Sequence, residues 1–265
     1  MRAIKRLRLR YAATCECGIE ISKGEFAGWD RSTRQTLCQN CLNSIPEPAA
    51  SPEAAGIPGA SLQREYERRV DAREARVLGR SPRIGRLLIK LSGPVRTTEA
   101  FAVGAEGERQ VAQVLEKKLG EDALFLYNRR RGIGQTMGDI DMLVVVQSGV
   151  YIIDPKKYDG RKVRTNRASD TFIIDGRRRT SLATSMHKQI EVVSAAMRSG
   201  AGPSMPVDAA YCFVGADLPW RTFRVVGVPA LNPRGVVKLL RQPGPFGPAD
   251  RIEMQRFLHK QFPSA

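Results

Sequence analysis

The sequence is poor in histidine and contains no long apolar run. Only two histidines, His187 and His259, occur among 265 residues, and neither lies at a spacing typical of metal ligands. This scarcity argues against a histidine-based nuclease or zinc hydrolase. No apolar stretch approaches the ~20 residues that cross a bilayer, and residues 1–10 lack the apolar core of a signal peptide. We therefore expect a cytoplasmic protein without membrane partners.

Acidic residues are also scarce relative to basic ones. The chain has 43 Lys and Arg residues against 27 Asp and Glu residues, which gives a formal net charge of +16. A positive field over much of the surface attracts polyanions, so nucleic acid, and DNA first, is the expected partner. The alternative interpretation is an Arg-rich proteome, in which the charge alone says nothing about a partner.

Cysteine is present five times, and four of the cysteines form two pairs. Cys15 and Cys17 are separated by twenty residues from Cys38 and Cys41, whereas Cys212 lies in an apolar run and is expected in the core. Two such pairs are typical of a small zinc ribbon, in which four thiolates close a tetrahedral Zn²⁺ site. The first pair is shorter than the usual Cys-x2-Cys, and free thiols on a disordered arm are the alternative. A ribbon would contact DNA phosphates or a protein partner.

Composition divides the chain into four segments. Residues 1–43 form the cysteine unit, and residues 44–60, rich in Pro and Ala, read as an extended linker. Residues 61–96 begin with a charged helix over 61–78 and form a helical connector. Residues 97–265 carry the main domain.

The main domain alternates helices and strands, which predicts an α/β fold with a mixed central sheet flanked by helices. Apolar periodicity predicts a helix over 99–119, β-type runs at 123–127, 139–146, 150–156 and 171–175, a helix over 181–198, further strands at 207–214 and 223–228, a helix capped by Asn232, and a last helix near 250–262.

An acid and a lysine lie two residues apart in one apolar strand. Side chains alternate faces along a strand, so Asp154 and Lys156 point to the same side. A two-residue turn at Ser148-Gly149 would place Asp141 on that face as well, opposite Lys156, whereas a three-residue turn would place it on the other face. The length of the turn therefore decides whether Asp141 belongs to the same site.

A third carboxylate comes from the helix predicted over 99–119. Glu108 lies on the same stripe as Val111, Leu115 and Leu119, which we expect to face the sheet. Gly104 and Gly107 lie near the same face and would let the helix approach the strands closely. Buried carboxylates need a partner. A core salt bridge with Lys156 or an arginine is the alternative to a metal-binding role.

Three carboxylates beside one lysine are suited to phosphodiester hydrolysis. Mg²⁺ or Mn²⁺ prefers oxygen ligands and keeps several waters, and a bound ion lowers the pKa of a water and neutralises charge on the phosphate. Lys156 would orient or help deprotonate that water and stabilise the transition state.

Three segments together resemble a known family. They are GAEGERQVAQVL at 104–115, GDIDMLVVVQSGVYIIDPKKYDG at 138–160 and Gln189 in the following helix. They are similar to the NERD (nuclease-related domain) family, which has the PD-(D/E)xK restriction-endonuclease-like fold. The resemblance implies metal ligation by Glu108, Asp141 and Asp154, catalysis by Lys156 and a supporting polar role for Gln189. Asp154 departs from the family pattern, which more often has Glu there.

The sequence thus predicts a divalent-metal-dependent nuclease that hydrolyses DNA phosphodiester bonds. The first alternative is a nucleic-acid-binding module that keeps the fold with weak or no catalysis, because family membership does not demonstrate activity. A zinc-dependent adaptor that recruits proteins is the second.

Overall fold

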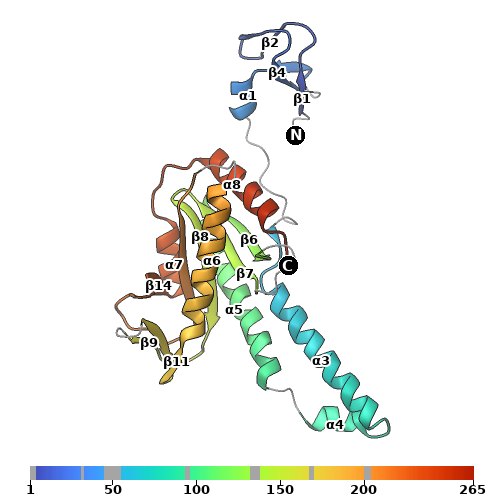
Figure 1. Cartoon of the computed structure of the whole chain (residues 1–265), viewed down its shortest axis with the longest axis vertical. Coiled ribbons are helices and arrows are strands. Elements are labelled where there is room, and N and C mark those ends of the chain that lie inside the picture. The colour runs from blue at the N-terminus through green and yellow to red at the C-terminus, as the bar shows by residue number, and fades with distance from the viewer. Residues whose placement is uncertain are drawn as a thin grey trace. The chain divides into compact units, whose positions relative to one another are not determined.

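The computed structural model describes residues 4–30, 33–44, 55–92, 96–131, 138–166, 170–199 and 204–265. The chain divides into two compact units, Met1–Pro48 and Ala49–Ala265 (Figure 1). Of the predicted linker, residues 45–54 lie outside the described residues, as do residues 93–95 of the predicted connector. Among the helices that are described, none has the length and apolar character needed to span a bilayer.

The N-terminal unit is built from short strands and one short helix. Its elements are β1 (Ile4–Arg8), β2 (Ala13–Thr14), β3 (Glu20–Ile21), β4 (Phe26–Asp30), β5 (Gln35–Leu37) and α1 (Gln39–Ser44). β1, β4 and β5 form one antiparallel sheet, and β2 pairs with β3 in a hairpin. The buried cluster consists of Cys15, Ile21, Ala27 and Cys38. So small an apolar core gives little hydrophobic stabilisation, and units of this size usually need a metal or disulfides.

The C-terminal unit is an α/β domain. Its helices are α3 (Ala60–Arg80), α4 (Gly85–Leu91), α5 (Arg96–Leu119), the 3₁₀ turn η1 (Gly120–Asp122), α6 (Thr180–Ser199), α7 (Pro233–Leu240) and α8 (Pro248–Gln261). Its strands are β6 (Leu124–Arg129), β7 (Ile140–Val146), β8 (Gly149–Lys157), β9 (Val163–Asn166), β10 (Thr171–Ile174), β11 (Arg177–Arg179), β12 (Val207–Val214), β13 (Phe223–Val225) and β14 (Val228–Leu231).

A mixed six-stranded sheet forms the centre of this unit, as the sequence predicts. Its strand order is β13-β14-β12-β8-β7-β6. The pairs β6–β7 and β7–β8 are antiparallel, the pairs β8–β12 and β12–β14 are parallel, and the edge pair β13–β14 is antiparallel. The chain passes from β8 to its parallel neighbour β12 through β9–β11 and α6, because parallel strands need a long crossover.

Helices cover both faces of the sheet (Figure 1). Val111 and Leu115 of α5 pack with α7 against one face, and Met186 of α6 and Met254 of α8 pack against the other. This double cover explains why β8 is apolar along most of its length, since both of its faces are buried. The charged residues of β8, which are Asp154, Lys156 and Lys157, all lie toward its C-terminal end.

Two predicted elements differ from the structure. The helix predicted over 99–119 begins earlier, at Arg96. The strand predicted over 223–228 is a hairpin, β13 and β14, that turns at Val226 and Gly227, both with positive φ. Positive φ at both central residues is typical of a type I′ turn. The aliphatic residues on both sides of the turn made the segment resemble one continuous strand.

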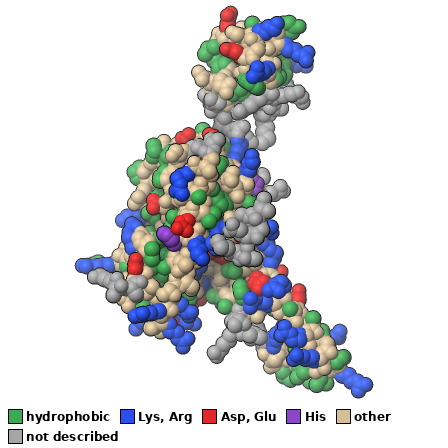
Figure 2. Space-filling model, in the orientation of Figure 1, with side chains coloured by type: hydrophobic (Ala, Val, Ile, Leu, Met, Phe, Trp, Pro, Cys, Tyr) green, Lys and Arg blue, Asp and Glu red, His purple; other side chains and the backbone are tan. Residues whose placement is uncertain are grey.

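A small second sheet, β11-β10-β9, follows β8. The strand β11 consists of three exposed arginines, Arg177–Arg179. Lys and Arg side chains gather over this sheet and over α3 and α4 on the face shown in Figure 2. On this face, groups of basic side chains therefore lie over these elements of the α/β unit (Figure 2).

Candidate functional site

The β7–β8 hairpin brings two aspartates together. Val146 pairs with Gly149 and Met142 with Ile153, so the turn residues are Gln147 and Ser148. The predicted turn at Ser148-Gly149 is therefore wrong by one residue. Continuing the observed register places Asp141 opposite Asp154 and not opposite Lys156. The observed pairing differs from the predicted pairing by an even number of positions, so Asp141 and Asp154 still share one face.

Lys156 lies between these two carboxylates. Its Nζ atom is 2.5 Å from Asp154 Oδ1 and 3.9 Å from Asp141 Oδ2. Asp154 is buried, with 6% of its surface exposed, and the other two side chains are partly buried. The end of the hairpin therefore holds two acids and one base in a small, largely dehydrated volume.

Glu108 reaches this group from α5 and is 3% exposed. Its Oε2 atom accepts a hydrogen bond from the backbone N–H of Gly59 at 2.9 Å. Gly107 lets α5 approach β8, as predicted for this glycine, since a Cβ atom at this position would lie 2.8 Å from Lys157 Cβ. Gly104, by contrast, faces Leu62 of α3 and not a strand.

Burial and mutual repulsion raise the pKa values of the acids. Burial raises the pKa of Glu108 to about 7, opposed by the charge of Lys156 and the N–H of Gly59 and assisted by Asp154 and Asp139. Burial also raises the pKa of Asp141 well above its ordinary value, against the charge of Lys156, and Glu108 and Asp154 raise it further. The charge of Lys156 thus offsets only part of the effect of burial on these two carboxyl groups.

Burial acts in the opposite direction on Lys156. It lowers the pKa of the ammonium group, but the charges of Asp154 and Asp141 outweigh it and the pKa lies above its ordinary value. Lys156 is therefore a stable cation in this structure, hydrogen bonded to Asp154.

A cavity of 840 Å³ opens beside these residues. Glu108, Asp141 and Lys156 line it, together with Lys157, Arg161 and Arg179. The wall of the cavity thus combines carboxylates and basic side chains. The sequence pattern did not predict that these three basic residues line a cavity. For Arg179, the arginine run of β11 is visible in the sequence, but its place beside the cavity depends on the fold of β9–β11.

Gln189 lies apart from the cavity wall. It is buried on α6, on the same stripe as Met186 and Val193. Those two residues pack in the cluster that contains Ile152, whose side chain points to the same face of β8 as Asp154. Gln189 therefore lies on a helix that covers the side of the sheet that carries Asp154.

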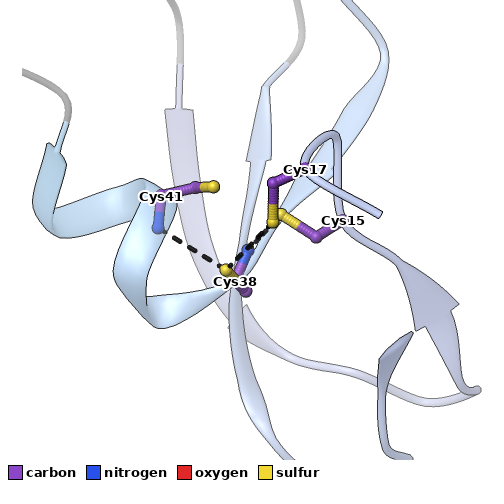
Figure 3. A group of neighbouring side chains, drawn as sticks. All are labelled: Cys15, Cys17, Cys38 and Cys41. Carbon is purple, nitrogen blue, oxygen red and sulfur yellow. Dashed lines mark hydrogen bonds between the residues drawn. The ribbon is translucent and has the colours of Figure 1, made fainter. Parts of the chain in front are cut away.

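The four N-terminal cysteines converge in the other unit (Figure 3). The sulfur atoms of Cys15, Cys17, Cys38 and Cys41 all lie within 4.8 Å of one another, and Cys17 Sγ and Cys38 Sγ are 3.8 Å apart. With Zn–S bonds of about 2.3 Å, the edge of a regular tetrahedron of sulfurs is about 3.8 Å. The predicted cluster fits a zinc-binding unit.

Backbone N–H groups support these sulfurs as well. Cys38 N donates to Cys15 Sγ at 3.0 Å, and Cys41 N donates to Cys38 Sγ at 3.5 Å. Burial acts to raise the pKa of Cys15, but hydrogen bonds from the backbone and side chains of Cys17 and Cys38 lower it to about 6. A thiolate at Cys15 suits a metal ligand, because the thiolate is the form that binds. Cys212 is buried in β12, as expected of a core residue.

One protein family matches the segment of the chain that carries the carboxylates. The family model of the nuclease-related domain, NERD, matches residues 103–214. This segment of the chain is therefore similar to a nuclease-related domain. Glu108, Asp141, Asp154 and Lys156 all lie within the matched segment, and the four clustered cysteines lie outside it. No curated protein and no solved structure gives a significant match to the chain.

Proposed function

We propose that the α/β unit is a nuclease that hydrolyses DNA phosphodiester bonds with Mg²⁺ or Mn²⁺. The observation that carries the proposal is the convergence of Asp141, Asp154 and Lys156 on one face of the β7–β8 hairpin, with Glu108 supplied by α5. The match of residues 103–214 to the family of nuclease-related domains also supports the proposal.

The donor set is suited to a hard divalent ion. Glu108, Asp141 and Asp154 offer carboxylate oxygens, the ligands that Mg²⁺ prefers. Burial first, and neighbouring carboxylates after it, raise the pKa values of Glu108 and Asp141, and a bound cation would stabilise their ionised forms. When bound, such an ion supplies an activated water and neutralises charge on the scissile phosphate.

The protein's own side chains supply the remaining functions. Lys156 carries a fixed positive charge beside the cavity, where it can orient a water and stabilise negative charge that develops on the phosphate. Lys157, Arg161 and Arg179 on the same wall can contact neighbouring phosphates of the backbone. We propose Gln189 as a supporting polar residue on the α6 side of the sheet.

The direct test is plasmid cleavage by the purified full-length chain with Mg²⁺ or Mn²⁺. We expect Asp154→Asn and Lys156→Ala each to lower the rate at least 100-fold, because each removes a group from the proposed chemistry. Asp208→Asn, a change at an exposed acid at the other end of β12, is the matched control and should leave the rate unchanged. Cleavage that survives both site substitutions would assign the activity to other residues.

A DNA-binding module without catalysis is the second candidate. The basic side chains of β11, Arg177–Arg179, favour it, because phosphate contacts alone need no metal. Salt-sensitive DNA binding by the wild-type chain, with no cleavage under either metal, would select this function over the first.

For the N-terminal unit we propose a structural Zn²⁺ held by Cys15, Cys17, Cys38 and Cys41. The mutual distances of the sulfurs and the N–H groups directed at Cys15 and Cys38 support it. We propose that this unit contacts DNA phosphates or a protein partner, and deletion of residues 1–43 should then weaken DNA affinity or abolish the protein interaction. Metal analysis that finds no zinc in the purified chain would contradict the site.

A further inference from the structure

One carboxylate of the site is bound by a segment that precedes the matched NERD residues. We call residues 55–61 the strap. Gly59, within the strap, donates its backbone N–H to Glu108 Oε2 at 2.9 Å in a buried position. The strap includes the first two residues of α3, which begins at Ala60. A segment outside the family match therefore contacts a proposed metal ligand.

The backbone of the strap lies too close to α5 for a side chain at Gly59. This residue has φ +74, and a Cβ atom on it would lie 2.6 Å from the carbonyl oxygen of Ala105. Ala105 is one turn of α5 before Glu108, so the strap rests on the helix surface beside the carboxylate. The close approach is what brings the Gly59 N–H within hydrogen-bonding distance.

Neighbouring contacts fix the strap to the strands as well. Ser61 Oγ donates to Asn128 Oδ1 at 2.8 Å, and Asn128 Nδ2 donates to the carbonyl oxygen of Ile57. Asn128 belongs to β6, the strand that pairs with the Asp141 strand β7. The strap thus joins the two elements that carry Glu108 and border Asp141.

We propose that the strap positions Glu108 as a metal ligand, with Gly59 as the positioning residue. The hydrogen bond to Oε2 fixes the rotation of the carboxylate and leaves Oε1 for an ion. Groups that orient a ligand in this way typically change metal affinity 10- to 100-fold when they are altered. This inference rests on the proposed nuclease function, because it takes the metal site as given.

The test measures Mn²⁺ affinity by electron paramagnetic resonance in the full-length, zinc-loaded chain. Gly59→Ala should weaken Mn²⁺ binding roughly 10- to 100-fold, because the new Cβ moves the N–H away from Glu108. Gly227→Ala is the matched control: its φ is +73, and nothing lies within 4 Å of the added Cβ. It carries the same backbone strain away from the site, and its Mn²⁺ affinity should equal that of the wild type.

A second measurement on the wild-type chain does not depend on the folding of a variant. Addition of Mg²⁺ should shift the amide resonance of Gly59 in a ¹H–¹⁵N spectrum, and the Gly227 amide should stay unchanged. Wild-type Mn²⁺ binding with an unchanged affinity in folded Gly59→Ala, or with an unmoved Gly59 amide, would overturn the role of the strap alone. Failure of the wild type to bind Mn²⁺ would overturn the proposed metal site and the strap's role with it.

Discussion

At the scale of single residues, the buried carboxylate of Glu108 lowers the stability of the folded protein when it is ionised. It is buried on a helix that otherwise packs apolar side chains, and its pKa is raised to about 7, first by burial. Its ordinary value is 4.5, so the folded chain binds this proton more tightly than the unfolded chain does. The stability contribution therefore falls as pH rises from about 4.5 to about 7, and above that range the buried charge costs roughly 3 kcal/mol.

Glu108→Gln should consequently stabilise the protein at pH 8 in buffer without divalent cations. The free energy of unfolding, measured with urea, should rise by roughly 2–3 kcal/mol at pH 8 and by much less at pH 5, because near pH 5 most of the wild-type carboxyl is already neutral in the folded chain. Glu253→Gln, at an exposed site on α8, serves as the control and should change little at either pH. A loss of stability in Glu108→Gln at pH 8 would show that the carboxylate is compensated in the folded protein.

At the scale of elements, the approach of α5 to β8 sets the distance between Glu108 and the hairpin acids. A Cβ atom at Gly107 would lie 2.8 Å from Lys157 Cβ and 3.5 Å from Lys157 N, so the helix must move away. We expect Gly107→Ala to lower stability by about 1–3 kcal/mol and to weaken Mn²⁺ binding. Gly79→Ala, a change in α3 with nothing within 4 Å, should instead raise stability by about 0.5 kcal/mol. Thermal unfolding of the two variants measures the contrast, and equal melting temperatures would contradict it.

The same elements show which features sequence patterns can predict. β7 and β8 are apolar runs bounded by polar residues, and the strand spacing alone placed Asp154 and Lys156 on one face. The turn was missed by one residue because Gln147-Ser148 lacks a typical turn pair, whereas Gly149 was an obvious turn residue that instead packs against Pro206. The predicted face of Asp141 was still correct, but only because the predicted register differed from the observed one by an even number of positions.

Contacts made by the backbone leave no recognisable pattern in the amino-acid sequence. The strap reads as part of a Pro- and Ala-rich linker, and the bond from Gly59 N to Glu108 involves no side chain of the strap. Arg179 is conspicuous as part of an arginine run, but only the fold of β9–β11 brings it to the cavity. Long-range backbone packing of this kind requires coordinates.

At the scale of the whole molecule, the chain joins two units that are stabilised in different ways. The α/β unit has large apolar clusters on both faces of its sheet, whereas the N-terminal unit has a small cluster that includes two of the clustered cysteines. Binding of zinc to sites of this type contributes roughly 10 kcal/mol or more at neutral pH. The N-terminal unit should therefore depend on its metal for folding, and the α/β unit should not.

The two tryptophans make this difference measurable, because one lies in each unit. Trp29 belongs to β4 of the N-terminal unit and is 37% exposed, whereas Trp220 in the α/β unit is 90% exposed. A zinc-selective chelator should shift the fluorescence of Trp29 to longer wavelength as its surroundings unfold, and the emission of Trp220 should stay unchanged because it already contacts solvent. Cys38→Ala should reproduce the shift without chelator, and Cys212→Ala, at a core cysteine outside the cluster, should retain zinc. Thermal unfolding of the α/β unit should be the same with and without chelator, and a joint loss of both units would show that the α/β unit also depends on the zinc.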